Sequence, residues 1–379
     1  MKNQIVPKRI VVDGRWIKAT GIGRYIENTL REILKLDNVN QYLLLVRDVD
    51  VPKLDLKADN LIFVPVNIDW YTTREQTLLL KKINDLKPDL VHFTNFNLPL
   101  GYKGRFVVTI HDLTLLKFKN VRRKFAHRYV YAVKEMAMRL TLRTGVTRSK
   151  AIIVPTEYVK DGIAKYFKVR RSKIFVTYQA ASQDVAVPRV NLEKYGIDKP
   201  YIMYAGNAYP HKNLERLIVA FGKLVTQYLL DYQLVIVGKK DSFHKELERE
   251  VADAKLKKRI IFTDFVSDQE LAGLYNKASL YVFPSLSEGF GLPALEAMSH
   301  GVPVASSNAT CLPEVLGDAA VYFDPHNPAK MAKVIADVLS DAKLREGLIK
   351  KGILQVKKYS WQKTAKQTLT VYQKALQSR

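Results

Sequence analysis

The segment SEGFGLPALEAM, residues 287–298, places two glutamates on either side of a glycine loop. The apolar run LYVF before it is typical of a buried strand, and Gly289 and Gly291 let a backbone approach a ligand closely. Pro293 fits the start of a helix, and Gly301 fits its end. The segment therefore predicts a strand, a loop and a helix whose N-terminus is suited to bind an anion.

The two carboxylates of this segment, Glu288 and Glu296, repel a phosphate but accept hydrogen bonds from hydroxyl groups. Backbone amides for a phosphate, flanked by acceptors for sugar hydroxyls, describe a nucleotide-sugar pocket. The alternative is an ordinary helix N-terminus with one acidic capping residue.

Short β-branched runs alternate with helix-like segments along the whole chain, which predicts parallel sheets covered by helices on both faces. The expected strands are residues 9–13, 42–46, 61–65, 89–93, 106–110, 151–155, 174–178, 201–205, 232–238, 259–263, 280–284, 302–306 and 319–323. Residues 180–200 have no long apolar run and two prolines, which indicates a linker. We therefore expect an α/β chain of two domains, residues 1–185 with a C-terminal helix at 362–379, and residues 186–361.

Three further motifs follow predicted strands. In YAGNAYPHKNLERLI, residues 204–218, Lys212 stands just before a helix, where an ammonium can neutralise a diphosphate. In VTIHDLTLL, residues 108–116, His111 and Asp112 follow the carboxyl end of a strand, where open α/β sheets bind ligands. An exposed lysine and a structural histidine are the respective alternatives.

The third motif, TGIGRYI at residues 20–26, predicts a glycine turn that enters a helix. It does not match the dinucleotide-binding fingerprint, because Ile26 occupies the position of the last glycine. A nicotinamide dehydrogenase is therefore disfavoured.

In order and spacing these motifs resemble family 4 glycosyltransferases of the GT-B fold, and the bacterial mannosyltransferase-like members in particular. The resemblance rests on EGFGLPALEAMSHGVPVASS, GNAYPHKNL, TIHDL, GIGRY and SNATCLPEVLGDAAVYFDP. It extends over nearly the whole chain. It implies two Rossmann-like domains whose parallel sheets face a central cleft, with the C-terminal helix crossing back to the N-terminal, acceptor-side domain.

The resemblance also implies a role for each matched residue. His111, Lys212 and Glu288 would be catalytic: His111 beside the donor sugar, Lys212 on the diphosphate and Glu288 on the sugar hydroxyls. The donor-binding residues would be Gly21, Gly23, Asn207, Lys212, Phe265, Val266, Glu288, Phe290, Gly291, Leu292 and Glu296. Among these, Glu296 would hold the ribose, and Phe265 with Val266 the base. Asp112, Arg24 and His211 would be auxiliary.

One position departs from the family pattern. Many members carry an arginine shortly after the glycine of the second motif, where it pairs with the lysine. Here Asn207 follows Gly206. The second cation of the diphosphate site is therefore not identified by the sequence, and Arg15 and Arg24 are candidates.

The expected reaction is the transfer of a hexose, mannose first, from GDP-mannose or a UDP-sugar to a glycan or lipid-linked acceptor in cell-surface polysaccharide or glycolipid synthesis. The resemblance implies retention of anomeric configuration and neither a cofactor nor a metal. A UDP-glucose or UDP-GlcNAc donor and a nucleotide-sugar epimerase are the alternatives. A nucleic-acid-binding protein is a remote one, because it would leave the two glutamates and their loop unexplained.

The net charge of +24 is unevenly distributed. Residues 1–190 hold 35 Lys and Arg against 17 Asp and Glu, whereas residues 191–379 hold 26 against 20. Residues 117–150 interleave cations with apolar side chains, which predicts an amphipathic face that binds an anionic membrane surface; the alternative is a solvated basic helix packed on the sheet. The single cysteine, Cys311, and the absence of a signal peptide or apolar span predict a cytoplasmic protein, peripheral on the inner face of the cell membrane.

Overall fold

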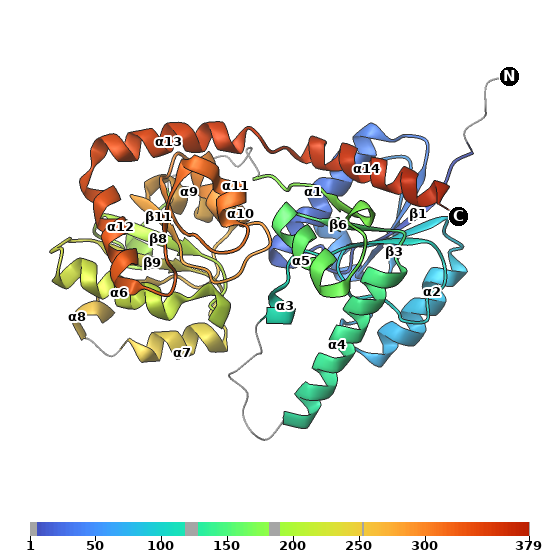
Figure 1. Ribbon diagram of the computed structural model, residues 1–379, viewed down its shortest axis with the longest axis horizontal. Helices are drawn as coiled ribbons and strands as arrows, with labels where there is room; N and C mark the ends of the chain where they lie inside the picture. Colours follow the sequence, from blue (N-terminus) through green and yellow to red (C-terminus); the bar gives the residue numbers. More distant parts are fainter. Residues whose placement is uncertain (1–5, 118–127, 182–189, 252–253, 379) are drawn as a thin grey trace. The chain divides into compact units, whose positions relative to one another are not determined.

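The computed structural model describes residues 6–117, 128–181, 190–251 and 254–378 of the chain (Figure 1). It comprises two compact units. The N-terminal unit is Met1–Gln179 with Ser360–Arg379, and the C-terminal unit is Ala180–Tyr359. Each unit is built around one parallel sheet covered by helices on both faces.

The N-terminal unit has a seven-stranded sheet in the order β3-β2-β1-β4-β5-β6-β7. Its strands are β1 Arg9–Asp13, β2 Gln41–Val46, β3 Leu61–Pro65, β4 Leu90–Phe93, β5 Phe106–Thr109, β6 Ala151–Val154 and β7 Ile174–Val176. Its helices are α1 Thr20–Leu36, α2 Leu80–Asp85, α3 Thr114–Lys117, α4 Arg128–Arg148, α5 Glu157–Phe167 and α14 Trp361–Gln377, with short turns η1 Asp48–Lys53, η2 Glu75–Leu79 and η4 Arg171–Lys173.

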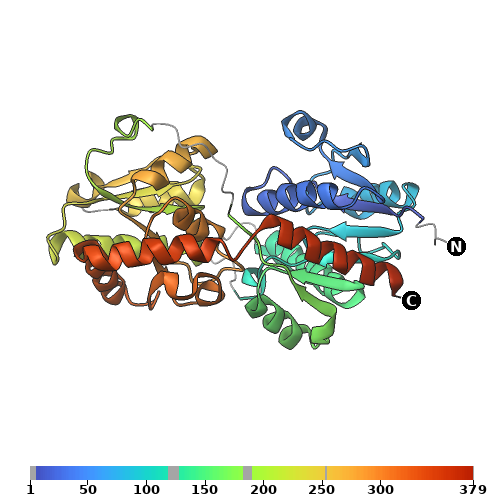
Figure 2. The same cartoon turned by 90° about the horizontal axis from the view of Figure 1, so that it is seen from above.

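Alternate residues of these strands enter two separate cores, because successive side chains of a strand point to opposite faces. Val11 packs with α2, α4 and α5 on one face, whereas Ile10 and Val12 pack with α1 and α14 on the other. Figure 2 shows α14 lying beside α1, with which it is in contact. The C-terminal helix thus completes the core of the N-terminal unit.

The C-terminal unit has a six-stranded sheet in the order β10-β9-β8-β11-β12-β13. Its strands are β8 Tyr201–Ala205, β9 Gln233–Val237, β10 Ile260–Phe262, β11 Leu280–Phe283, β12 Val304–Ser307 and β13 Ala320–Phe323. Its helices are α6 Leu214–Thr226, α7 Ser242–Glu250, α8 Ala254–Lys257, α9 Asp268–Lys277, α10 Leu292–Ser299, α11 Leu312–Leu316, α12 Pro328–Ser340 and α13 Ala342–Val356, with short turns η5 Glu193–Tyr195, η6 Pro210–Lys212 and η7 Gly317–Ala319.

The strand order reverses once in each sheet, between β1 and β4 and between β8 and β11. At such a point the loops that follow the two central strands leave in opposite directions, and ligands of open α/β sheets bind outside the carboxyl ends of those strands. The two reversals therefore mark where a binding site is expected in each unit.

Every segment predicted as a strand contains one, so the α/β fold class is confirmed. The glycine turn expected at residues 20–26 is wrong, because α1 already begins at Thr20 and includes both glycines. The Gly23 amide donates to the carbonyl of Ala19 at 2.9 Å, which closes the first helical turn before the expected helix start. Within the described residues, no helix is both long and apolar enough to cross a membrane.

Candidate active site

The carboxyl ends of β8 and β11 carry two of the predicted residues in the C-terminal unit. The loop after β8 ends at Lys212, and the loop after β11 carries Glu288. The two side chains meet: Lys212 Nζ lies 2.6 Å from Glu288 Oε1, and their exposed fractions are only 16% and 12%. A partly buried ion pair therefore stands at the point where the strand order reverses.

Three hydrogen bonds hold these loops together. The amide of Leu286 donates to the carbonyl of His211 at 2.8 Å, which joins the loop after β11 to the loop after β8. Buried Asn213 donates from Nδ2 to the carbonyls of Pro284 and Pro325, at 2.9 and 2.8 Å. Lys212 and Glu288 are therefore presented by anchored backbone.

The N-terminus of α10 lies directly after Glu288. Gly291 precedes the helix with a φ of 102°, a conformation that favours glycine, and a Cβ there would lie 2.9 Å from Leu312 Cδ2. The N-cap residue is Gly291 itself, which has no side chain to cap the helix. Phe290 and Leu292 are buried, and the Phe290 ring packs edge-on against Tyr359 at 5.6 Å. The arrangement suits an anion at the helix N-terminus, beside the Lys212 ammonium.

Glu296 is one turn inside α10 and is 8% exposed. Both glutamates lie near the Tyr281 hydroxyl, which donates to the carbonyl of Ala205 at 3.3 Å. Burial raises the pKa of Tyr281 and of Tyr204, and the nearby Glu288 carboxylate raises both further. These tyrosines therefore stay neutral, and the cation that pairs with Glu288 is Lys212.

The other predicted residues of this unit lie after β10 or in the loop after β8. Phe265 and Val266 follow β10, two strands from β8; Phe265 is 77% exposed, whereas Val266 is buried. Asn207 accepts a hydrogen bond at its carbonyl from the Tyr204 hydroxyl at 2.8 Å. His211 is half-buried and its ring lies against Tyr209. Phe265, one of the two residues predicted to contact the base, thus presents an exposed aromatic ring. The contact with the base stays a prediction.

His111 follows β5 in the N-terminal unit and is held from three sides, on one of which Gln179 Nε2 lies 3.5 Å from its Nδ1. Its Nε2 lies 2.8 Å from the carbonyl oxygen of Thr94, and Tyr25 of α1 packs edge-on against its ring at 4.9 Å. Because a carbonyl only accepts, Nε2 carries the proton and Nδ1 is an acceptor. Burial lowers the pKa of His111, although the Thr94 contact and nearby Asp112 oppose this. His111 is therefore a neutral imidazole.

The two glycines of the GIGRY motif differ in what surrounds them. A Cβ on Gly23 would lie 2.3 Å from the carbonyl oxygen of Ile17, so this glycine is required by packing. A Cβ on Gly21 would meet nothing within 4 Å. Arg24 is half-buried on α1, and exposed Asp112 accepts the amide of Thr114 at 2.7 Å, which starts α3. Gly21 is thus the glycine with no structural requirement for its identity.

Arg15 is not a free cation. Its guanidinium is fully buried, donating from Nε to Asp13 at 2.9 Å and from Nη2 to Asp13 and Glu75 at 2.8 Å each. Burial alone would lower its pKa, but the two carboxylates outweigh that and raise it. Arg15 therefore belongs to the core of its own unit and does not replace the missing arginine of the family pattern.

The sequence did not reveal the polar network behind His111. His92 lies within the sheet, with Nδ1 2.7 Å from the Tyr372 hydroxyl and Nε2 2.8 Å from Thr109 Oγ1, and the Tyr25 hydroxyl lies 3.0 Å from the same Thr109 oxygen. Burial lowers the pKa of His92 to about 3, with His111 adding to the effect. Tyr25 stands inside the quoted GIGRY motif, but its partners are distant in sequence.

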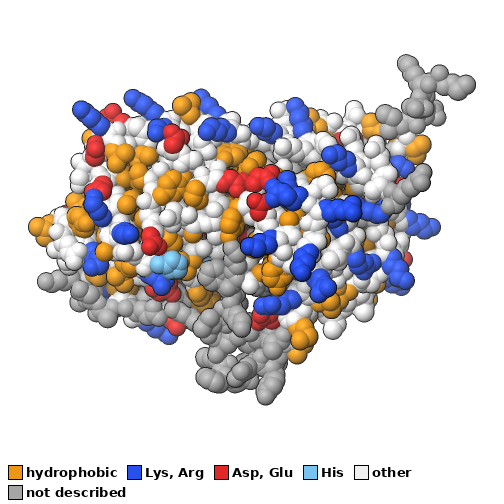
Figure 3. Space-filling view, in the orientation of Figure 1, with side chains coloured by type: hydrophobic (Ala, Val, Ile, Leu, Met, Phe, Trp, Pro, Cys, Tyr) orange, Lys and Arg blue, Asp and Glu red, His pale blue; other side chains and the backbone are white. Residues whose placement is uncertain are grey.

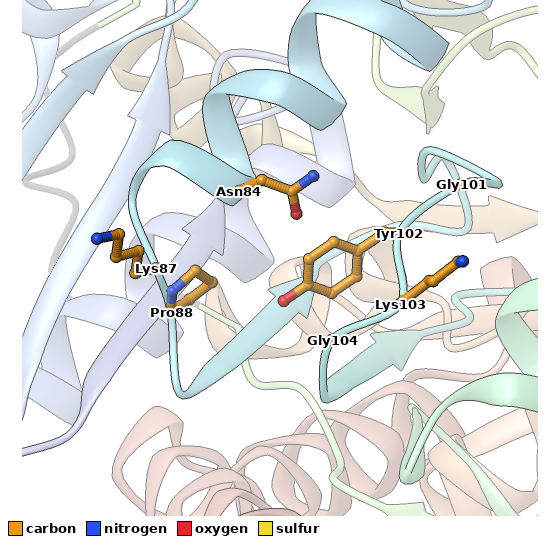
Figure 4. A pocket seen from close by; sticks show the side chains of 7 residues that line it. All are labelled: Asn84, Lys87, Pro88, Gly101, Tyr102, Lys103 and Gly104. Atoms are coloured by element: carbon orange, nitrogen blue, oxygen red, sulfur yellow. The ribbon is translucent and has the colours of Figure 1, made fainter.

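A second feature of the N-terminal unit contains none of the predicted residues. A cavity of about 440 Å³ lies at the amino edge of the sheet, before β4 and β5, away from His111. It is lined by Asn84, Lys87, Pro88, Gly101, Tyr102, Lys103 and Gly104 (Figure 4). No cluster of three or more His, Cys, Asp or Glu side chains that could hold a metal ion occurs within the residues that the structure covers.

Comparison with known proteins agrees with this arrangement. The family described as "Glycosyltransferase Family 4" matches residues 19–181, and the family described as "Glycosyl transferases group 1" matches residues 190–355. O-antigen chain mannosyltransferase B of Escherichia coli is 31% identical, over 93% of this chain and 96% of that protein. O-antigen chain mannosyltransferase RfbU of Salmonella typhimurium is 30% identical, over 63% of this chain and 65% of that protein.

Solved structures share the fold. Sucrose-phosphate synthase from Thermosynechococcus elongatus superposes with a TM-score of 0.77 at 18% identity, covering 97% of this chain and 98% of that one. HepE of Anabaena, in complex with UDP and glucose, superposes with a TM-score of 0.73 at 14% identity, covering 97% and 99%. These are glycosyltransferases of the GT-B fold. From its sequence motifs, its two parallel sheets and its relatives, the chain belongs to glycosyltransferase family 4.

Proposed function

We propose that this chain transfers mannose from GDP-mannose to a glycan or lipid-linked acceptor in cell-surface polysaccharide synthesis. The observation that carries the proposal is the Lys212–Glu288 pair beside the N-terminus of α10, at the point where the strand order of the C-terminal sheet reverses. The choice of mannose is supported by the two relatives that are named as O-antigen mannosyltransferases. UDP-glucose and UDP-GlcNAc are the competing donors.

In the proposed mechanism, Lys212 leaves Glu288 and binds the diphosphate of the donor. As the bond between sugar and phosphate breaks, negative charge grows on the leaving diphosphate, where the Lys212 ammonium and the N-terminus of α10 stabilise it. Glu288 is then available to accept hydrogen bonds from hydroxyls of the donor sugar. Glu296 accepts hydrogen bonds from the ribose hydroxyls in this proposal.

His111 acts in this proposal as a neutral acceptor. Its Nε2 proton is engaged by Thr94, so Nδ1, which now faces Gln179 Nε2 at 3.5 Å, is the atom that accepts a hydrogen bond from a sugar hydroxyl. A neutral imidazole positions the sugar without opposing the positive charge that develops at the anomeric carbon. We further propose that an acceptor hydroxyl attacks from the face that the diphosphate leaves and passes its proton to the leaving diphosphate oxygen, which retains the anomeric configuration. The cationic groups named above replace a metal ion in this proposal.

The donor is tested by thermal unfolding of the full chain with GDP-mannose, UDP-glucose and UDP-GlcNAc. A ligand at 100 times its Kd stabilises the native state by about 2.7 kcal/mol. For a unit of this size that corresponds to a shift of roughly 5–10 °C in Tm. GDP-mannose should give the largest shift, with an equal shift in EDTA and in Mg²⁺. A shift confined to UDP-sugars would replace mannose by another donor, and no shift with any of them would reject the proposal.

The product distinguishes the competing reactions. With methyl α-mannoside as acceptor, proton NMR of the new glycoside reports whether the anomeric configuration is retained. The same incubation without acceptor tests the epimerase alternative, since an epimerase converts the sugar nucleotide into its epimer while a transferase at most hydrolyses it.

We also propose that α4 brings the chain to an anionic membrane surface. Val133, Met136 and Leu140 are exposed by 69%, 73% and 51%, and their spacing places them on one side of the helix. The opposite side, with Leu142 and Val146, is buried in the core. Figure 1 shows the N-terminal end of α4 extending beyond the other elements of its unit.

Two cationic side chains, Lys134 and Arg143, are exposed on the same helix as this apolar stripe. Each such cation contributes about 1 kcal/mol to the free energy of binding to an anionic surface. Each apolar side chain adds roughly 1.5–3 kcal/mol when it is completely buried in the membrane. Of the predicted membrane segment 117–150, residues 118–127 lie outside the described residues, as do the side chains of 128–132. The proposal rests on the remainder.

Sedimentation with vesicles tests it. The chain should bind vesicles that contain phosphatidylglycerol at least three times more than vesicles of phosphatidylcholine alone, and Met136→Glu should remove the difference. Tyr166→Glu, a change at a 55% exposed side chain on α5 of the same unit, is the matched control. Equal binding of both vesicle types would reject the membrane proposal and leave the transfer reaction untouched. A gel shift with duplex DNA tests the nucleic-acid alternative.

A further inference from the structure

The loop after β12, residues 308–311, lies in the motif SNATCLPEVLGDAAVYFDP, whose residues have no part in the mechanism proposed above. β12 runs parallel to β11, with Ser306 paired with Phe283, so this loop leaves the same edge of the sheet as the loop that carries Glu288. The two loops are in contact, because the amide of Glu288 donates to Thr310 Oγ1 at 3.2 Å, across 22 positions of the chain. The motif therefore supplies a partner for one of the proposed site residues.

Thr310 has a strained backbone conformation. Its φ is 57°, in the left-handed region that favours glycine. Among the non-glycine residues with positive φ in the described parts of the chain, Thr310 is the β-branched one. A β-branched residue in this region is a genuine outlier, and glycine or asparagine would adopt the same φ at a lower cost. Strain of this kind persists where the surrounding structure enforces it, and it clusters at functional sites.

The backbone on both sides of Thr310 is anchored. On the N-terminal side, the amide of Asn308 donates to the carbonyl of Phe323 at 3.0 Å, which ties the loop to β13. On the C-terminal side, Cys311 and Leu312 are fully buried. The surrounding structure therefore imposes the strained φ and holds the Thr310 side chain in place.

The hydroxyl group of Thr310 is engaged by its own unit. Its oxygen accepts the amide of Glu288, and the thiol of buried Cys311 is its second hydrogen-bonding neighbour. Burial raises the pKa of this thiol well above its ordinary value, so the sulfur stays protonated. Because the hydroxyl already has two partners within the protein, it is suited to hold the backbone of Glu288 rather than to bind a substrate.

The position of Glu288 is important because its carboxylate has two tasks in the proposed mechanism. It holds the Lys212 ammonium at 2.6 Å in the structure, and it accepts hydroxyls of the donor sugar once Lys212 has moved to the diphosphate. The loop is anchored before Glu288 by the amide of Leu286, which donates to the carbonyl of His211 at 2.8 Å. At Glu288 itself, the anchor is the contact with Thr310.

We infer that Thr310 is a positioning residue for the transfer reaction. Its hydroxyl fixes the backbone of Glu288 and thereby places the carboxylate first on Lys212 and then on the sugar hydroxyls. A displacement of about 1 Å in such a group can slow a reaction by about 100-fold. The inference rests on the proposed function and adds to it a residue that acts through Glu288.

Three variants at position 310 separate the hydroxyl from the strain. Thr310→Ser keeps the hydroxyl, Thr310→Val keeps the β-branched shape without it, and Thr310→Gly removes both the hydroxyl and the strain. The rate measured is the release of GDP from GDP-mannose with methyl α-mannoside as acceptor. It should stay within about two-fold of the native rate in Thr310→Ser and fall at least ten-fold in the other two. Thr226→Val, at an exposed threonine on α6 of the same unit, is the matched control and should keep the native rate.

Two further measurements distinguish positioning from a structural role. The loss in Thr310→Gly should appear in kcat with KM for GDP-mannose nearly unchanged, and Tm should stay within about 3 °C of the native value, because relief of strain offsets the lost hydrogen bond. In the Glu288→Gln background, Thr310→Gly should cause no further loss, because the group that it positions has already lost its charge.

Native rates in both Thr310→Val and Thr310→Gly would overturn the inference. So would a rate in Thr310→Ser as low as that in Thr310→Val, or losses from Thr310→Gly and Glu288→Gln that multiply in the double variant. In each of these cases the native chain still releases GDP, so the proposed function stands. A native chain that releases no nucleotide from any of the three sugar nucleotides would instead reject the proposed function, and this inference with it.

Discussion

Replacement of Glu288 by glutamine should tighten the binding of free GDP or UDP and at the same time abolish sugar transfer. In the structure Glu288 holds the Lys212 ammonium at 2.6 Å, and both side chains are largely buried. In the proposed mechanism a diphosphate has to take Lys212 from this carboxylate and then lie near its charge. Glutamine keeps the shape of the side chain and removes the negative charge.

The size of the effect follows from the charges. A phosphate bound to Lys212 would lie about 6 Å from the Glu288 carboxylate, where two unit charges repel by about 3 kcal/mol at an effective dielectric constant of 20. Solvent and salt reduce this to roughly 1–2 kcal/mol, which is about a ten-fold lower Kd. Transfer should fall by about 10²–10³-fold, because the acceptor for the sugar hydroxyls loses its charge.

Isothermal titration with GDP and UDP, and initial transfer rates at saturating donor, measure the two effects. The matched control is Glu346→Gln, at an exposed glutamate on α13 of the same unit, which should change neither. Damage to the fold would weaken binding and transfer together and would lower Tm. A native transfer rate in Glu288→Gln, or weaker nucleotide binding with an unchanged Tm, would refute the assignment of this pair.

Three further changes test other parts of the molecule. Gly21→Ala should raise the free energy of urea unfolding by up to about 1 kcal/mol, because alanine favours the first turn of α1 and its Cβ meets nothing in the protein. The same change should slow transfer at least ten-fold if the donor approaches this backbone. Phe265→Ala should change stability by less than about 0.5 kcal/mol and weaken nucleotide binding by about 1–3 kcal/mol if its exposed ring stacks on the base. The pKa of His92 falls from 6.5 to about 3 on folding, so the stability that neutral His92 gives is complete above pH 6.5 and is lost as the pH falls toward 3. Between pH 7 and pH 5 the free energy of unfolding of the native chain should fall by about 2 kcal/mol, and that of His92→Gln should not show this fall.

Local pattern was sufficient to predict the strands and the sheet edge at which the polar residues of the motifs lie. Short β-branched runs next to turn residues form buried strands almost regardless of context, and polar residues after them fall at the carboxyl edge. The sequence could not show that Lys212 and Glu288 touch, because 76 residues separate them and only the order of the strands brings β8 beside β11. Their contact therefore depends on the order of the strands in the sheet.

The residues that sequence reasoning missed depend on distant partners. Tyr25 reaches Thr109 across 84 positions, and Tyr372 reaches His92 across 280, so no local motif predicts either contact. Arg15 follows a strand and looked available as a second cation, but Glu75 arrives from a different loop and neutralises it together with Asp13. The identity of a residue indicated its chemistry here, whereas burial decided whether that chemistry was available to a ligand.

The charge distribution supports a division of labour within the chain. Residues 1–190 carry a surplus of 18 positive charges, obtained as 35 minus 17, yet no lysine or arginine lines the cavity that Trp16, Tyr71 and Phe96 form beside His111. Arg15, the cation at that edge of the sheet, is balanced by two carboxylates. Figure 3 shows Lys and Arg side chains spread over the visible surface of the N-terminal unit. The cations of residues 1–190 therefore lie mainly on the surface, which is the distribution that the proposed membrane contact needs. Residues 191–379 carry the smaller surplus and include Lys212, the lysine that the proposed mechanism assigns to the diphosphate.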